Sequence, residues 1–170
     1  MASLADYNAG NLHGRWIDAT QGAEGIRKEI AEMLADSDEP DAEEFAIHDY
    51  DNFGGLKLSE FADVEQVAEA AALIAEHGPV FANLVDHFGG LSNLDEARHY
   101  MEDGYCGEYD DVGWYAAYLV NDLYHELVEP LPDLIRNNID YDAIGRDFEL
   151  GGDIFTIALG GKVHVFDSHL

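Results

Sequence analysis

The sequence predicts an α+β protein in three successive parts: a mixed part at residues 1–58, a helical part at 59–104 and a second mixed part at 105–170. The clearest β signal is "DIFTIALGGKVHVF" at 153–166, where apolar residues flank a Gly-Gly pair that suits a tight hairpin turn. Helical spacing of apolar residues, punctuated by caps and stops, dominates the middle of the chain. These observations predict small sheets in the outer parts and helices between them.

The first part is predicted to begin with a hairpin. Short β-prone runs at 4–7 and 12–17 flank the turn-forming letters "NAGN". Residues 21–35 follow with apolar residues at helical spacing, which predicts a helix with one packed stripe and one polar face. The stretch "EEFAIHDYDNF" at 43–53 is predicted to add a strand to the same sheet.

The middle part carries explicit helix signals. Asp63 and Gln66 resemble a capping box, and "HGP" at 77–79 supplies a glycine and a proline that stop the first helix. Apolar residues then continue at helical spacing to the next Gly-Gly pair. Ser92 is predicted to cap a third helix, which Gly104 ends.

A long helix is predicted near the start of the third part. Asp110 or Asp111 can cap it, and it should run to about Val128, before a proline. One of its faces is apolar and is expected to pack in the core. This face carries Val112, Ala116, Leu119 and Leu123.

The opposite face of that helix carries Trp114, Tyr118 and His125. A helix with a second aromatic face needs a second packing partner. That partner is either more of the protein's own core or a second subunit, and the residues alone leave both alternatives open.

Net charge is the unusual quantity in the composition. The chain has 36 acidic and 8 basic residues, which gives −28 at pH 7, and residues 29–56 and 99–135 contain no lysine or arginine. Duplex DNA with 28 charges would be about 48 Å long, or about fourteen base pairs. Repulsion between like charges argues against direct binding of nucleic acid, whereas a protein with a basic DNA-binding groove fits as a partner. Halophilic adaptation or simple solubility is the alternative reading of the same composition.

The sequence also indicates in which cellular compartment the protein is expected. The single cysteine, Cys106, cannot form an internal disulfide, and no basic segment followed by an apolar one opens the sequence. The most apolar stretch is interrupted by charged residues, glycine and proline, so no membrane span is expected. These features predict a cytoplasmic protein.

The sequence contains no complete motif of a metal-binding, nucleotide-binding or catalytic site. The acidic stretch from Asp36 begins like a calcium loop, but it has proline at the fifth position and Ile47 at the twelfth. "HELVE" at 125–129 ends in glutamate where a zinc protease needs histidine, and no nucleotide-binding or hydrolase motif occurs. Acidic surroundings should blunt the reactivity of the Cys106 thiol. We therefore expect no enzyme activity, no metal and no cofactor.

Several stretches together resemble the ArdA antirestriction family, over essentially the whole chain and in the same order. They combine a "YNxGxLxGxW" pattern, "AIHDY", "IDYxAxxRD" and a closing glycine hairpin, and none of them is catalytic. The chain differs from the usual family pattern at Asn138, where we expect an aromatic residue, and at Gly145, where alanine is usual. The resembling stretches lie at 7–19, 43–53, 87–91, 104–122 and 137–166.

The resemblance implies an elongated, dimeric, three-domain mimic of duplex DNA, carried by mobile genetic elements. Its carboxylates would imitate DNA phosphates and occupy the DNA-binding groove of a type I restriction-modification enzyme, formed by the specificity and methyltransferase subunits. Such an inhibitor would block restriction and also modification. A regulator of other basic DNA-binding proteins is the alternative for the same acidic surface.

The carboxylates expected to form the DNA-mimic surface lie in clusters along the chain. The family's dimerisation also makes Trp114, Tyr115 and Tyr118 candidate interface residues. Arg146, a rare base beside acidic neighbours, is expected to pair internally. The predicted surface carboxylates are Asp36, Asp38, Glu39, Asp41, Glu43, Glu44, Asp49, Asp51, Glu60, Asp63, Glu65, Glu69, Asp95, Glu96, Glu102, Asp103, Glu108, Asp110 and Asp111.

Overall fold

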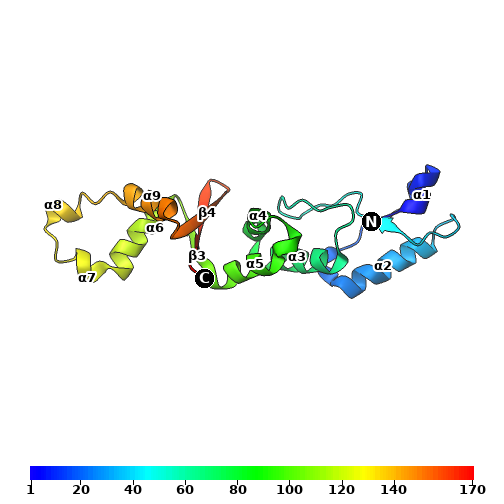
Figure 1. Cartoon of the computed structure of the whole chain (residues 1–170), viewed down its shortest axis with the longest axis horizontal. Coiled ribbons are helices and arrows are strands. Elements are labelled where there is room, and N and C mark those ends of the chain that lie inside the picture. The colour runs from blue at the N-terminus through cyan, green and yellow to red at the C-terminus, as the bar shows by residue number, and fades with distance from the viewer. The chain divides into compact units, whose positions relative to one another are not determined.

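The computed structural model describes all residues from 1 to 170 and confirms the α+β class, with nine α-helices and two small antiparallel sheets (Figure 1). The chain forms two compact units, residues 1–98 and residues 99–170. The elongated arrangement of three domains stays a prediction. None of the helices combines the length and the apolar character needed to cross a membrane.

The first unit begins with a short sheet and a helix instead of the predicted hairpin. Strand β1 (Ala2–Ser3) pairs antiparallel with β2 (Phe45–Ala46), so the strand expected in 43–53 is present but two residues long. The predicted strand at 4–7 is wrong, because helix α1 (Leu4–Ala9) occupies it. The Ser3 side chain caps this helix by accepting from the Asp6 backbone N–H, and left-handed Gly10 ends it. The run at 12–17 contributes a single bridge, between Ala2 and Gly14.

Helix α2 (Ala23–Ala35) confirms the helix predicted at 21–35 and follows a 3₁₀ turn, η1 (Ala19–Gln21). Its buried side chains Ile26 and Ile30 pack against helix α3 (Val64–His77). One hydrophobic core therefore joins the first predicted part of the chain to the helices of the second.

The start of α3 confirms the predicted cap. The Asp63 carboxylate accepts a 3.1 Å hydrogen bond from the Gln66 backbone N–H. Gly78, at φ 76°, ends α3, and Pro79 begins helix α4 (Pro79–His87). Proline fits there because the first N–H of a helix has no partner within the helix.

The predicted cap at Ser92 is wrong. Ser92 lies inside a 3₁₀ turn, η2 (Leu91–Asn93), and its side chain caps nothing. Helix α5 (Leu94–His99) follows directly and continues as the π-helical turn η3 (Tyr100–Gly104). The predicted end at Gly104 is confirmed.

The second unit contains a three-stranded antiparallel sheet. The strand order is β3 (Tyr105–Tyr109), β5 (Lys162–Asp167), β4 (Ile154–Leu159). The predicted hairpin is confirmed as β4 and β5, with the turn residues Gly160 and Gly161 at φ 62° and 81°. Two successive positive φ angles are typical of a primed hairpin turn, whose twist matches the strands.

The long helix predicted up to Val128 is wrong in its second half. Helix α6 (Val112–Tyr118), capped by Asp111, passes into the π-helical turn η4 (Leu119–Leu123). The Asn121 side chain donates a 2.8 Å hydrogen bond to the Ala117 carbonyl, and such side-chain bonds compete with the helical backbone ladder. The remaining helices are α7 (His125–Val128), α8 (Asp133–Arg136) and α9 (Tyr141–Gly151).

Helices α6 and α9 approach each other closely at Gly145. A Cβ atom on Gly145 would lie 2.4 Å from the carbonyl oxygen of Val112, which real structures do not tolerate. The core of this unit holds Tyr115 on α6, Ile154 on β4 and Val165 on β5. Gly145, unusual in the sequence pattern, therefore has a packing reason.

Candidate functional site

The predicted surface carboxylates do lie on the surface. All of them are exposed except Glu39 and Glu69, which are half-buried. They differ in their partners, however, and those partners separate carboxylates that stabilise the fold from carboxylates with an open charge.

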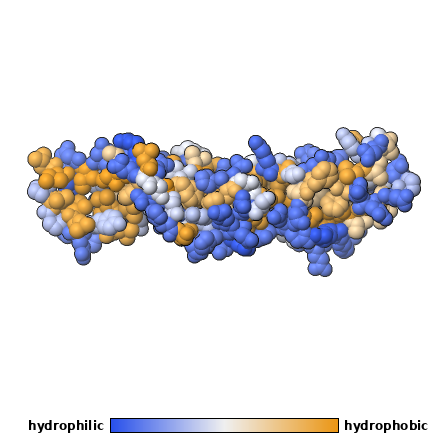
Figure 2. Space-filling view, viewed as in Figure 1, coloured by the Kyte–Doolittle hydropathy of each residue, from blue (hydrophilic) through white to orange (hydrophobic).

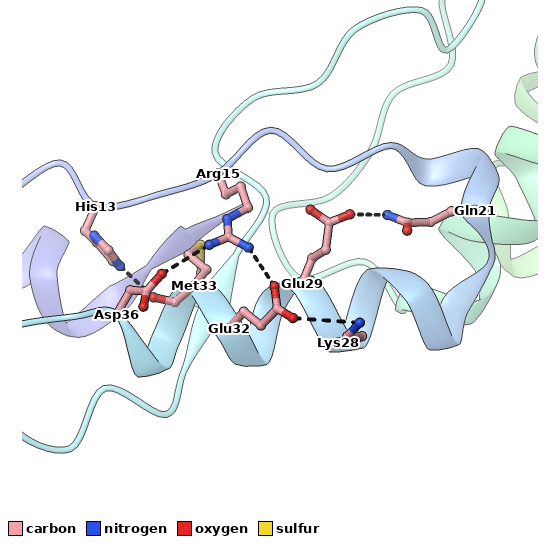
Figure 3. Close-up of polar contacts among 8 residues, drawn as sticks. All are labelled: His13, Arg15, Gln21, Lys28, Glu29, Glu32, Met33 and Asp36. Atoms are coloured by element: carbon pink, nitrogen blue, oxygen red, sulfur yellow. Dashed lines mark hydrogen bonds and ion pairs between the residues drawn. The ribbon is translucent and has the colours of Figure 1, made fainter.

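One group is paired with the chain's few bases. Arg15 reaches across helix α2, with 3.2 Å from its two terminal nitrogens to a carboxylate oxygen of Glu32 and of Asp36 (Figure 3). Asp36 therefore helps to hold the segment before η1 on α2. The other predicted carboxylates with a lysine or arginine partner are Glu65 with Arg27, Glu69 and Asp95 with Arg98, and Asp110 with Lys162.

Ion pairing also affects protonation at one of these sites. The hydrogen bond and the charge of Asp110 raise the pKa of the Lys162 amine above its ordinary value.

Arg146 on α9 is exposed and forms no ion pair, so the prediction that it pairs internally is wrong. Sequence neighbours four or fewer residues away on α9 do not reach its guanidinium.

A second group has structural or histidine partners. Asp63 and Asp111 cap helices α3 and α6. Three more carboxylates lie near histidine nitrogens, where an ion pair forms when the imidazole is protonated. These pairs are Glu60 with His48 at 3.6 Å, Asp103 with His99 at 3.0 Å and Glu108 with His164 at 3.8 Å.

The carboxylates of the loop after α2 form the largest group without a base. We call residues 36–44 the acidic loop. Asp38, Asp41, Glu43 and Glu44 are exposed in it, and none has a cationic partner. Glu39 accepts a 3.3 Å hydrogen bond from the Asn11 side-chain amide, which leaves its charge uncompensated. The acidic loop thus presents several negative charges to solvent.

The acidic loop is tied to the body of the first unit. Ser37 Oγ donates to the buried carboxylate of Asp6 at 2.6 Å and accepts from the Glu39 backbone N–H at 3.0 Å. At the other end of the loop, the Leu4 backbone N–H donates to the Glu44 carbonyl at 3.0 Å. Hydrogen bonds from the Ser3 and Ser37 hydroxyls hold the pKa of Asp6 below its ordinary value, against the opposing effect of burial. Hydrogen bonds at both ends therefore hold the acidic loop, with its exposed carboxylates, against the first unit.

Asp49 and Asp51 follow strand β2 and also lack a base. One carboxylate oxygen of each accepts from the next backbone N–H, that of Tyr50 at 2.9 Å and that of Asn52 at 2.8 Å. Both residues line a pocket of about 780 Å³ in the first unit. Sequence reasoning did not find this pocket, because it forms only where residues 16–20, 47–54 and helix α3 meet.

Two predicted carboxylates, Glu96 and Glu102, are exposed and unpaired on α5 and η3. Glu76 was not predicted, although it is exposed on α3 and free of ion pairs. It lies on the same helical face as Glu65 and Glu69, since spacings of four and seven residues return to one side of an α-helix. That spacing is the signal that would have found it.

The candidate dimer residues separate by exposure. Trp114 is 61% exposed and Tyr118 is 46% exposed, whereas Tyr115 is 7% exposed and packs in the core of its own unit. Burial raises the pKa of the Tyr115 phenol. Leu123, expected in the core, is instead exposed at the end of the π-helical turn η4. Figure 2 shows hydrophobic residues gathered over the part that holds α7 and α8. The exposed large hydrophobic residues there are Leu123, Tyr124, Leu127, Leu134 and Ile135.

No group of three or more histidine, cysteine, aspartate or glutamate side chains is arranged to hold a metal ion. Cys106 is half-buried, and its thiol donates to the Gly104 carbonyl at 3.4 Å.

Comparison with known proteins agrees with the resemblance seen in the sequence. The family model described as "Antirestriction protein (ArdA)" matches residues 1–162 of the chain. No curated protein sequence matches it. Because the family match spans nearly the whole chain, the chain belongs to the ArdA family of antirestriction proteins.

Proposed function

We propose that this antirestriction protein acts as a mimic of duplex DNA and occupies the DNA-binding groove of type I restriction-modification enzymes. The acidic loop carries the proposal, because all of its carboxylates except that of Asp36, which pairs with Arg15, have no cationic partner within the chain. A net charge of −28 supplies the long-range attraction to a basic groove.

The chemistry of DNA-binding enzymes explains how such a surface inhibits. These enzymes hold DNA largely through lysine and arginine contacts to phosphate oxygens. A carboxylate offers the same cations two acceptor oxygens, and arginine binds it with two parallel hydrogen bonds. The protein has no base edge to be read and no phosphodiester bond to be cut. Inhibition should therefore depend little on the target's recognition sequence.

The target groove is formed by the specificity and methyltransferase subunits, so occupation of that groove blocks modification as well as restriction. The protein works in the cytoplasm, as a homodimer. Trp114 and Tyr118 are the exposed members of the interface that we propose, and the hydrophobic residues around α7 and α8 extend it. Burial of such apolar side chains against a second copy would remove them from water.

Displacement of DNA tests the proposal directly. A fluorescently labelled duplex is bound to a purified type I methyltransferase core, and the protein is added at about 50 mM and about 200 mM salt. We expect stoichiometric release of the duplex that weakens as salt rises, because salt screens contacts between charges. A neutral protein of similar size serves as the control.

Matched variants then separate the acidic loop from net charge. D38N/D41N and E24Q/D86N each remove two exposed carboxylates from the first unit, but only the former changes the acidic loop. We expect D38N/D41N to need at least threefold more protein for half displacement, with E24Q/D86N close to the parent. Absence of displacement by the folded parent protein at both salts, across several type I enzymes, would reject the proposal.

A further inference from the structure

The pocket of the first unit combines apolar, aromatic and acidic residues, whereas a surface that only carries negative charge needs no apolar or aromatic lining. Its floor is apolar and comes from helix α3, with Val67, Ala71 and Ile74. Its walls carry the aromatic side chains of Trp16, Tyr50 and Phe53, and its carboxylates are those of Asp18, Asp49 and Asp51. No lysine, arginine or histidine lines it.

The carboxylates at the pocket outnumber its positive groups. The only cationic group there is the Met1 amine, which donates to the Arg15 carbonyl at 3.0 Å and is also attracted by the charge of Asp49. Asp18 binds the Thr20 backbone N–H and hydroxyl through a single oxygen, Oδ1. Asp49 and Asp51 likewise use only Oδ1, for the backbone N–H of the next residue. Each of the three carboxylates therefore keeps its second oxygen for a further donor.

Two of the three aromatic side chains, Tyr50 and Phe53, are held in place by contacts within the chain. The Tyr50 hydroxyl accepts a 3.2 Å hydrogen bond from the Leu58 backbone N–H, and its ring meets Phe53 edge-on at 5.9 Å. Trp16, in contrast, is 69% exposed although it is one of the largest apolar side chains. The fixed rings of Tyr50 and Phe53 lower the entropy cost of binding, because they need not be ordered when a ligand arrives. The exposed indole of Trp16, beside carboxylates, offers a face on which a planar cation can stack.

From this arrangement we infer that the pocket binds an arginine side chain, with the residues next to it, from a basic segment of the target enzyme. The inference rests on the proposed function for the identity of the partner. Arginine fits better than lysine because its planar guanidinium stacks on aromatic rings and binds carboxylates through two parallel hydrogen bonds. The volume, about 780 Å³, lies within the range of ligand pockets, roughly 300–1,000 Å³. It can accept a short stretch of chain as well as one side chain.

The binding step is tested without the enzyme. The chain has two tryptophans, so the variant W114F leaves Trp16 as the single tryptophan reporter. The probe is acetyl-Gly-Arg-Gly-Arg-Gly-amide, titrated at about 50 mM salt, where screening of exposed charges is weak. The same peptide with citrulline in place of arginine is nearly isosteric and uncharged. We expect a saturable change in Trp16 fluorescence, with at least tenfold weaker binding of the citrulline peptide.

Two charge variants of the W114F protein locate the binding. D49N/D51N removes two carboxylates from the pocket, and we expect at least tenfold weaker binding of the arginine peptide. E24Q/D86N removes the same charge from exposed positions that do not line the pocket, and we expect less than a twofold change. The variant W16F, with Trp114 as reporter, should show no saturable change. Circular dichroism verifies that each variant is folded.

Displacement of DNA from the enzyme core then links the pocket to the target. D49N/D51N should need at least fivefold more protein than E24Q/D86N for half displacement. Equal binding of the two peptides, or equal loss in the two charge variants, would overturn the pocket as an arginine site even if the parent protein displaces DNA. Normal displacement by D49N/D51N would overturn its use by the target. Peptide binding without any displacement by the parent protein would instead reject the proposed function and leave the arginine site standing.

Discussion

Ser37 Oγ donates a 2.6 Å hydrogen bond to Asp6 Oδ2, which joins the start of the acidic loop to helix α1. Asp6 is 4% exposed, so this bond lies at the edge of the protein interior, while the loop it holds faces solvent. The same hydroxyl accepts from the Glu39 backbone N–H. One serine therefore connects a buried carboxylate to a surface of exposed ones, and the first prediction follows from it.

The stability of the first unit should depend on pH through Asp6. Hydrogen bonds from Ser3 and Ser37 lower the pKa of Asp6 in the folded protein. A carboxyl with a lowered folded pKa contributes stability that is present above its unfolded pKa, about 3.9, and is lost as pH falls through the folded value. We expect the urea midpoint of the parent protein to fall more steeply between about pH 5 and pH 2 than that of D6N. Parallel pH curves for the two proteins would contradict this.

Replacing Gly145 by alanine should not stabilise the protein, although Gly145 lies inside helix α9. A Cβ there would lie 2.4 Å from the Val112 carbonyl oxygen, and backbone cannot move aside cheaply. The alanine would gain about 1 kcal/mol of helix propensity, but overpacking costs about 1–3 kcal/mol, so we expect a net loss of about 0–2 kcal/mol in the free energy of unfolding. Urea denaturation measures this loss.

Gly25→Ala provides the matched control for that substitution. The three atoms nearest its added Cβ belong to the flexible side chain of Gln21 in η1, at 2.7–2.9 Å. The change in unfolding free energy should lie between zero and about 1 kcal/mol of stabilisation. If both alanine variants behave alike, the close approach of α6 and α9 does not govern stability.

Arg15 should stabilise the fold without contributing to inhibition. Its ion pairs with Glu32 and Asp36 are partly exposed, so R15Q should lose about 0.5–1.5 kcal/mol of stability at low salt. The loss should shrink at about 0.5 M salt because the pairs are screened. Displacement of DNA should be as strong as for the parent, since the variant makes the surface more negative. K57Q, which removes a lysine that forms no ion pair, is the control and should leave stability unchanged.

Trp114 and Tyr118 should hold two copies of the chain together. W114D and Y118D each place a charge in an exposed aromatic patch, and burying that charge at an interface is costly. We expect both variants to be monomers by light scattering at concentrations where the parent is a dimer. F61D, at an exposed aromatic residue of the first unit, should remain dimeric. A dimer that survives both substitutions would place the interface elsewhere.

Local signals in the sequence were reliable where neighbours in the chain decide the conformation. The cap at Asp63, the helix at 23–35 and the glycine hairpin between β4 and β5 are set by residues within four positions of one another. The strand predicted at 4–7 was wrong because the prediction considered only the apolar residues of this run. Ser3, just before it, caps a helix instead. The break after Leu123 was missed because no glycine or proline marks it in the sequence, where the first proline after it is Pro130.

The sequence by itself determined the α+β class, the excess of negative charge and membership of the ArdA family. Only the tertiary structure decided which carboxylates are neutralised, because their partners lie far along the chain: Arg98 pairs with Glu69, 29 residues away, and Lys162 with Asp110, 52 residues away. It also decided that Trp16 and Asp49 face one pocket. Composition sums charges, whereas Coulomb attraction depends on the distance between them, and that distance exists only after the chain has folded.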